Sequence, residues 1–222
     1  MSYKLIALDI DGTIRSDDHP LSERTRRAIG KARDAGAVIT LATGRMFRSA
    51  VRSAAELGIT TPIASSQGAH IADPVTGQVL WHMPLTSEMA RSALEAAEPW
   101  NLEVMCFRGD AVIASKMTPW LEGYRKRNDV EVRQVGDLAG SAGDNLTRLV
   151  VRGADDVIER MEADLKARFN SELYVTRSLP YFCEILHPLA GKDRALERLA
   201  STMGIDRRDT IAFGNGYNDV AM

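Results

Sequence analysis

The sequence predicts an α/β protein with a Rossmann-like, parallel-sheet core that is interrupted by an inserted α+β cap domain. In the first third, short apolar runs rich in β-branched residues alternate with amphipathic helices. The middle of the chain contains strand pairs beside helices, which are typical of an antiparallel sheet. The last segment returns to the first pattern. We therefore expect a core from residues 1–82 and 188–222, and a cap from residues 83–187.

The expected core elements follow one another in a regular order. Ser22 can cap a helix that runs to Asp34, and Gly58 can end a second helix that starts near Met46. The apolar runs between and after these helices are continuous rather than alternating, so we expect parallel strands covered on both faces. These strands are expected at residues 4–10, 37–43, 61–66 and 209–215, and a further helix is expected at residues 191–203.

The expected cap begins after a hairpin that turns at residues 73–77. A helix from Thr86 leads into this segment, and the loop "GDLAGSAGDN" at residues 136–145 lies within it. The strands are expected at residues 102–106, 111–114, 146–151, 173–176 and 181–186, with helices near residues 119–127 and 155–169.

The composition excludes several classes of protein. The chain has 222 residues, 45% of them apolar, and a formal net charge of −2, without the basic stripe of a nucleic-acid surface. It has neither a signal-peptide pattern nor the roughly 18-residue apolar run of a membrane span. Cys106 and Cys183 lack metal-ligand spacing. We expect a cytoplasmic protein that binds neither nucleic acid nor membrane.

Polar residues follow three of the expected parallel strands, where ligands bind in open α/β sheets. Asp9 and Asp11 follow the first strand, and two-residue alternation predicts that they point to one side. Neighbouring carboxylates repel each other unless a cation lies between them. Gly12 would let the backbone turn its N–H groups toward an anion. A pair of surface aspartates in a turn, or the metal-binding pair of a glycosyltransferase, are alternative interpretations.

Four motifs together resemble those of the haloacid dehalogenase superfamily. They are "LDIDGT" at residues 8–13, "LATGR" at residues 41–45, Gly191-Lys192, and "GNGYND" at residues 214–219. The position and αβ character of the insert are similar to those of the Cof-type phosphatases.

The resemblance implies a mechanism and a set of roles. Asp9 attacks phosphorus and forms an aspartyl phosphate, while Asp11 serves as general acid and base. Thr43 and Lys192 stabilise the phosphoryl group. Thr43 could instead cap the next helix, and Lys192 could be an ordinary exposed lysine. The further residues implied for phosphate binding are Gly12, Gly44, Arg45 and Asn218, although Arg45 could equally pair structurally and Asn218 could orient Lys192.

The resemblance also implies Mg²⁺, held by Asp9, Asp11 through its backbone carbonyl, Asp219 and Asn215. Relatives usually have aspartate in place of Asn215, so we expect weaker Mg²⁺ binding here. Gln67 stands where they often have asparagine. The histidines, His19, His70, His82 and His187, show no ligand spacing.

The chain ends at Met222, whereas the resemblance implies further C-terminal elements. The strand near residues 210–214 would then have an open edge, through which a homodimer could form.

The leading functional prediction is a Mg²⁺-dependent phosphatase for a small phosphorylated metabolite, either a sugar phosphate or a phosphorylated carboxylic acid or cofactor. The insert would close over the core and exclude water. A phosphomutase and a catalytically weak phosphoester-binding or regulatory protein are the alternatives. An acyl-phosphate receiver module fits poorly, because receivers lack so large an insert.

Overall fold

The computed structural model describes residues 3–16 and 20–222, so His19 lies outside the described residues. The contacts within the chain divide it into two compact units. Unit 1 comprises Met1–His82 and Ala190–Met222, and unit 2 comprises Met83–Leu189. The second boundary therefore lies two residues later than the position expected from the sequence.

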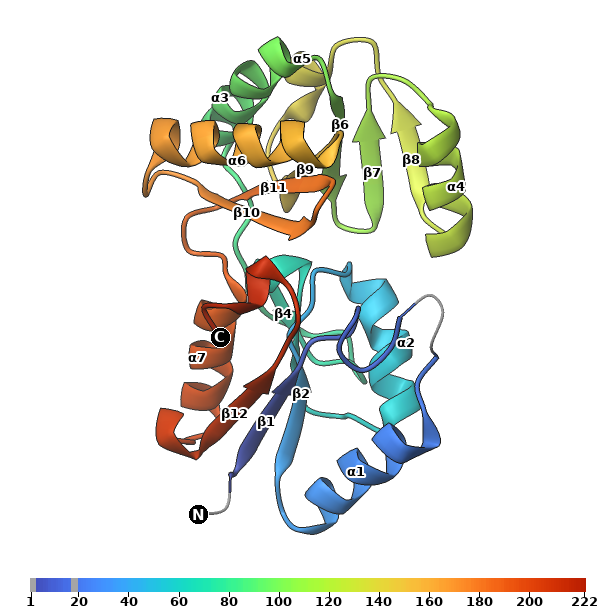
Figure 1. Ribbon diagram of the computed structural model, residues 1–222, viewed down its shortest axis with the longest axis vertical. Helices are drawn as coiled ribbons and strands as arrows, with labels where there is room; N and C mark the ends of the chain where they lie inside the picture. The colour runs from blue at the N-terminus through green and yellow to red at the C-terminus, as the bar shows by residue number, and fades with distance from the viewer. Residues whose placement is uncertain (1–2, 17–19) are drawn as a thin grey trace. The chain divides into compact units, whose positions relative to one another are not determined.

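Unit 1 is built on a parallel sheet in the order β12-β1-β2 (Figure 1). Strand β1 (Leu5–Leu8) lies in the centre and pairs with β2 (Val38–Leu41) on one side and β12 (Thr210–Phe213) on the other. All three strands run in the same direction, so their carboxyl ends meet at one edge of the sheet. This edge carries the residues of the candidate site.

Helices cover both faces of this sheet. Helices α1 (Glu23–Asp34) and α2 (Phe47–Leu57) pack on the face that carries Ile39 and Leu41, within one apolar cluster. Helix α7 (Lys192–Thr202) packs on the opposite face, where Leu196 and Ala200 join Leu5 and Ala7. The predicted Rossmann-like α/β fold is confirmed.

The third expected parallel strand differs from the prediction. Strand β3 (Ile63–Ser65) contacts the parallel sheet through a single bridge between Ala42 and Ala64. Its ladder is antiparallel, with β4 (His70–Ala72), which pairs in turn with β5 (Val79–His82). The strand is short because the 3₁₀ turn η1 (Ser66–Gly68) reverses the chain immediately after it.

Unit 2 contains a mixed sheet in the order β10-β11-β9-β6-β7-β8. The only parallel pair in this described sheet is β7 with β8. The strands are β6 (Glu103–Arg108), β7 (Ala111–Ala114), β8 (Glu131–Gln134), β9 (Arg148–Arg152), β10 (Tyr174–Leu179) and β11 (Phe182–Leu186).

Helices also cover the sheet of unit 2. Helices α3 (Ser87–Ala97) and α6 (Asp155–Phe169) bury their apolar residues in one cluster with alternate residues of β6, β9 and β11. Helix α4 (Pro119–Asn128) lies on the other face, where Tyr124 contacts the ring of Phe107. The segment η2 (Glu98–Trp100) extends α3 by one turn.

Two local expectations for this part of the chain were wrong. Residues 136–145 are not a continuous loop, because α5 (Leu138–Ala142) begins where the Asp137 side chain accepts the N–H of Gly140. Strand β8 was not expected at all. In unit 1, the residues after β12 form a single 3₁₀ turn, η4 (Tyr217–Asp219), and the 3₁₀ turn η3 (Arg207–Asp209) precedes β12.

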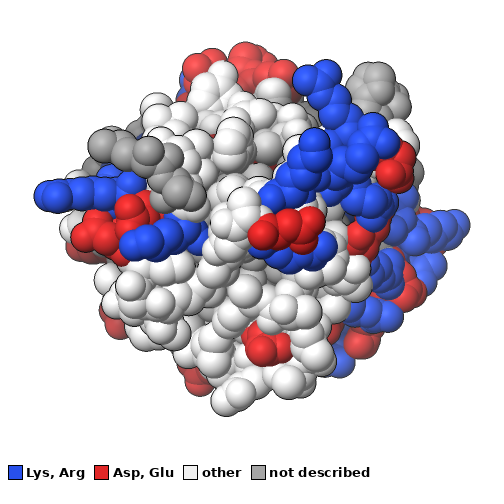
Figure 2. All heavy atoms as spheres, turned by 90° about the horizontal axis from the view of Figure 1, so that it is seen from below, with Lys and Arg blue, Asp and Glu red and all other residues white. Residues whose placement is uncertain are grey.

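Within the described ranges, every helix is too short or too polar to cross a lipid bilayer. On the face shown in Figure 2, Lys and Arg side chains gather toward one side, Asp and Glu side chains lie among them, and much of the surface is uncharged. The absence of a nucleic-acid partner, the cytoplasmic location and the homodimer stay predictions.

Candidate active site

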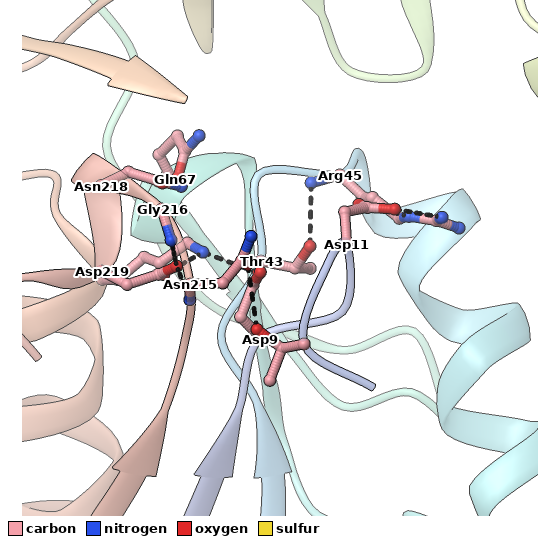
Figure 3. A network of polar contacts seen from close by, with 11 residues as sticks. Asp9, Asp11, Thr43, Arg45, Gln67, Asn215, Gly216, Asn218 and Asp219 are labelled. Atoms are coloured by element: carbon pink, nitrogen blue, oxygen red, sulfur yellow. Dashed lines mark hydrogen bonds and ion pairs between the residues drawn. The ribbon is translucent and has the colours of Figure 1, made fainter. Parts of the chain in front are cut away.

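The candidate site is assembled from loops that follow β1, β2 and β12, together with the first residue of α7 (Figure 3). Asp9 directly follows β1, Thr43 follows β2, and the loop after β12 carries Asn215 and Asp219. Lys192 is the first residue of α7. The parallel arrangement of the three strands brings these distant segments to one place.

The centre of the site is a buried cluster of three charged side chains. The Lys192 ammonium donates to Asp9 Oδ1 at 2.7 Å and to Asp219 Oδ1 at 2.6 Å. The side chains of Asp9, Lys192 and Asp219 are 7%, 1% and 6% exposed. Lys192 therefore lies between Asp9 and Asp219, whereas the sequence predicted a cation between Asp9 and Asp11. The alternative of an exposed lysine at a helix start is wrong.

Burial is the main influence on the acidity of Asp9. It raises the pKa of this carboxyl group above its ordinary value of 3.8, because the charged form loses solvation. The attraction and the hydrogen bond of Lys192 act in the opposite direction, and the charge of Asp219 adds to the rise. Asp9 is thus a carboxylate with little solvation, a favourable state for a nucleophile.

Asp219 also organises the loop that carries it. Its Oδ2 accepts the backbone N–H groups of Asn215 and Gly216, at 3.0 and 2.9 Å. The loop consequently folds around the same carboxylate that binds Lys192.

The expectation that Asp9 and Asp11 point to one side is wrong. Asp11 is exposed and accepts two hydrogen bonds from Arg45, from Nε at 2.8 Å and from Nη2 at 2.6 Å. Figure 3 shows this pair lying apart from Asp219. Strand β1 ends at Leu8, and the chain turns at Ile10, whose carbonyl accepts the N–H groups of the next turn, so strand alternation does not extend to Asp11.

Thr43 is fully buried, and its Oγ1 accepts the backbone N–H of Arg45 at 3.2 Å. This contact shapes the turn before α2, but Thr43 does not cap that helix, whose N-cap residue is Met46, so the alternative of a helix cap is wrong. The roles predicted for Thr43 and Arg45 in phosphate binding stay predictions.

Asn215 joins the last loop to the first. Its Oδ1 accepts a hydrogen bond from Thr13 Oγ1 at 3.0 Å. Gly12 has a φ of +79°, and a Cβ there would lie 2.3 Å from Asn215 Nδ2. Glycine is therefore required at position 12 for both its backbone conformation and this close approach.

Gln67 is a buried residue of this region that was not among the predicted site residues, although relatives often have asparagine at its position. Its Oε1 accepts a hydrogen bond from Asn218 Nδ2 at 2.9 Å. The sequence predicted that Asn218 contacts phosphate or orients Lys192, and in the structure its side-chain amide donates to Gln67. Gly44 lies against the same glutamine, because a Cβ there would be 2.5 Å from Gln67 Nε2.

The chemistry of the donors in this region suits a hard cation. Asp9 and Asp219 supply carboxylate oxygens, Asn215 an amide oxygen and Asp11 a backbone carbonyl, and oxygen ligands are those that Mg²⁺ prefers. Among the residues that the structure describes, no three His, Cys, Asp or Glu side chains form a potential metal cluster. The set contains two buried carboxylates only, in keeping with the amide at position 215.

A sequence model described as haloacid dehalogenase-like hydrolase matches residues 6–222. The chain belongs to this family. The resemblance to the superfamily and to its Cof-type branch, deduced from the four motifs, is confirmed.

Individual relatives of this hydrolase carry phosphatase names. This chain is 28% identical over 225 residues to the 5-amino-6-(5-phospho-D-ribitylamino)uracil phosphatase YitU of Bacillus subtilis, and the match covers 98% of this chain and 82% of that protein. It is 24% identical over 225 residues to the HMP-PP phosphatase of Cronobacter sakazakii, covering 99% of this chain and 80% of that protein. The family and these relatives support the predicted enzyme class, a phosphoric monoester hydrolase.

The fold has close counterparts among solved structures. A haloacid dehalogenase-like hydrolase from Bacteroides thetaiotaomicron superposes with a TM-score of 0.81 at 26% identity, covering all of this chain and 85% of that chain.

Proposed function

We propose that this hydrolase is a Mg²⁺-dependent phosphatase that acts on a small phosphorylated metabolite through an aspartyl-phosphate intermediate. The observation that carries the proposal is the buried Asp9–Lys192–Asp219 cluster at the carboxyl ends of the parallel strands. A weakly solvated carboxylate beside a fixed positive charge combines a nucleophile with stabilisation for phosphoryl oxygens.

In the first step, an Asp9 carboxylate oxygen forms a bond to phosphorus as the bond between phosphorus and the ester oxygen breaks. The departing alkoxide receives a proton from Asp11, so the leaving group departs as a neutral alcohol. In the second step, water attacks the aspartyl phosphate and transfers a proton to Asp11, which releases inorganic phosphate and regenerates Asp9.

Asp11 requires a change of partner before it can act as an acid. In the structure it is held by both Arg45 hydrogen bonds. A substrate phosphate that binds the Arg45 guanidinium in the same forked geometry would free the Asp11 carboxyl group. Phosphate binding by Arg45 and proton transfer by Asp11 are thereby linked.

Mg²⁺, held by Asp9, Asp219, Asn215 and the Asp11 carbonyl, would supply positive charge that offsets the charge of the phosphoryl oxygens. Lys192 provides part of this charge from the protein itself. Thr43 would add a hydroxyl donor to the same group.

The relatives support the proposed class of substrate, since YitU and the HMP-PP phosphatase are named for small phosphorylated compounds. A catalytically weak phosphoester-binding protein is the second candidate, because Asn215 leaves the metal set with only two carboxylates.

A phosphate-release screen over phosphorylated metabolites, with and without Mg²⁺, tests the proposal. We expect release that requires Mg²⁺ and is abolished by Asp9→Asn. Binding of esters without turnover would support the second candidate, and an isomerised ester without free phosphate would indicate a phosphomutase. Full activity of Asp9→Asn would refute the role of Asp9 as nucleophile.

A further inference from the structure

The turn between β3 and β4 contains an unusual backbone conformation. Ser66 and Gln67 have φ angles of +49° and +56°, so two consecutive residues other than glycine adopt the left-handed region. Such residues are disfavoured there because Cβ crowds the following carbonyl. This conformation persists only where surrounding contacts hold it, and it is found most often at functional sites.

The backbone of Gln67 connects two loops of the candidate site. Its N–H donates to the Thr43 carbonyl at 3.1 Å, and its carbonyl accepts the N–H of Gly191 at 3.0 Å. Gly191 directly precedes Lys192. The left-handed turn therefore ties the loop after β2 to the start of α7.

The side chain of Gln67 connects a third loop. It is 1% exposed, and its Oε1 accepts from Asn218, which lies 151 residues further along the chain. Figure 3 shows the two amides next to each other, beside Gly216 and Asp219. Asn218 Oδ1 packs against Gly216, since a Cβ there would lie 2.4 Å away. The Asn218 amide is thus held between Gln67 and its own loop.

These contacts form a path from Gln67 to the charged cluster. Asn218 and Asp219 are neighbours within η4, and Asp219 binds the Lys192 ammonium. Fixing the Asn218 amide fixes the turn that aims the Asp219 carboxylate. Through its carbonyl, Gln67 also holds the residue before Lys192, so both partners of one ion pair depend on the same glutamine.

We propose that Gln67 is a positioning residue that sets the geometry of the Lys192–Asp219 pair through Asn218 and Gly191. The proposal rests on the phosphatase function for its catalytic consequence. It predicts that Gln67 acts on turnover more than on substrate affinity, because Gln67 bonds to Asn218 and Gly191, which hold the charged cluster in place.

The test compares Gln67→Leu, Asn218→Leu and the double variant. Each replacement removes the hydrogen bond between Gln67 and Asn218, and we expect each single variant to lower kcat about tenfold with KM little changed. If Gln67 acts through Asn218, the double variant loses no more than the worse single variant, rather than about a hundredfold. Asn101→Leu is the matched control, because Asn101 is an exposed amide in unit 2 that also has a left-handed φ of +50°. We expect this variant to have the kcat of the wild-type protein.

A second readout is independent of catalysis. The Lys192 ammonium is buried and bonded to two carboxylates, so its protons exchange slowly enough to give a ¹H–¹⁵N NMR signal, assignable by its loss in Lys192→Met. We expect Gln67→Leu and Asn218→Leu to shift or broaden this signal alike, and Asn101→Leu to leave it unchanged. Should Gln67→Leu fail to fold, Gln67→Gly removes the amide while tolerating the left-handed backbone.

The outcomes separate the two proposals. A wild-type protein that releases no phosphate refutes the phosphatase function, and the NMR signal still decides the role of Gln67. Additive losses in kcat, or an unaltered Lys192 signal in Gln67→Leu, would overturn the positioning role.

Discussion

Replacing Lys192 with methionine tests the physical basis of the charged cluster. The substitution removes the ammonium group but keeps a side chain of similar length and apolar volume. Removing one partner from a buried ion pair typically costs about 3–5 kcal/mol, since the remaining charge loses its compensation. In this cluster the remaining charges are Asp9 and Asp219, both almost fully buried.

The magnitude can be checked from the geometry. Both carboxylates contact one nitrogen, at 2.7 and 2.6 Å, so the contacting oxygens lie at most about 5 Å apart. At an effective dielectric constant of about 20, two like charges at that separation or closer repel by at least about 3 kcal/mol. The two estimates agree, and we expect Lys192→Met to lower the free energy of unfolding by about 3–5 kcal/mol at pH 7.

The pH dependence gives the loss a distinctive signature. Without Lys192, repulsion raises the pKa of one carboxyl group, and protonation of that group then relieves the repulsion. The destabilisation should therefore shrink as the pH falls from 7 toward 5, and Asp9→Asn in the same chain should restore part of the stability at pH 7.

Urea unfolding at several pH values measures these quantities. Lys4→Met is the matched control, because Lys4 forms an ion pair of 2.6 Å with Asp209 but its side chain is 66% exposed. Its removal should have a much smaller effect, since solvent screens exposed pairs. An equal loss in the two variants, or a loss at Lys192 that does not change with pH, would refute the reasoning.

Three further predictions concern the metal, the nucleophile and the first loop. Asn215→Asp restores a third carboxylate, so we expect Mg²⁺ to bind more tightly by titration calorimetry; equal or weaker binding would contradict this. Burial raises the pKa of Asp9, so the protonated Asp9 carboxyl group stabilises the fold below pH 3.8, and this stabilisation is lost as the pH rises through the folded-state pKa. We therefore expect Asp9→Asn to gain stability relative to wild type between pH 4 and 7, as measured by urea unfolding. A difference in unfolding free energy that does not change with pH would argue against this. Gly12→Ala places a methyl group against Asn215 at a φ of +79°, so we expect the free energy of unfolding to fall by about 1–3 kcal/mol and turnover to be impaired. An unchanged unfolding free energy and an unchanged kcat would show that the loop adapts easily.

The fold was largely predictable because its signals are local. Continuous apolar runs such as Leu5–Leu8 mark buried parallel strands, and the α6 bounds follow from helical periodicity alone. Strand β8 was missed because "EVRQ" is mostly exposed and charged at a sheet edge, and carries no apolar pattern. Helix α5 was missed because glycines and aspartates, which are typical of loops, recur through residues 136–145, and the short helix begins at one aspartate cap.

The sequence predicted which residues form the site better than it predicted their arrangement. The motifs indicated Asp9, Lys192 and Asp219, which the structure brings together. The different surroundings of Asp9 and Asp11 could not be deduced, because their partners lie 183 and 34 residues away. Gln67 was left out of the candidate set for the same reason: its partner, Asn218, is adjacent only after folding.

The split of unit 1 between the two ends of the chain has a consequence for biosynthesis. As the polypeptide leaves the ribosome, β1 and β2 emerge early, whereas α7 and β12 emerge only after all of unit 2. Until then, the half of the β1 ladder that pairs with β12 is open, and Asp9 lacks its cationic partner. The nascent chain therefore has an open strand edge beside β1 until unit 2 has been synthesised and β12 has emerged.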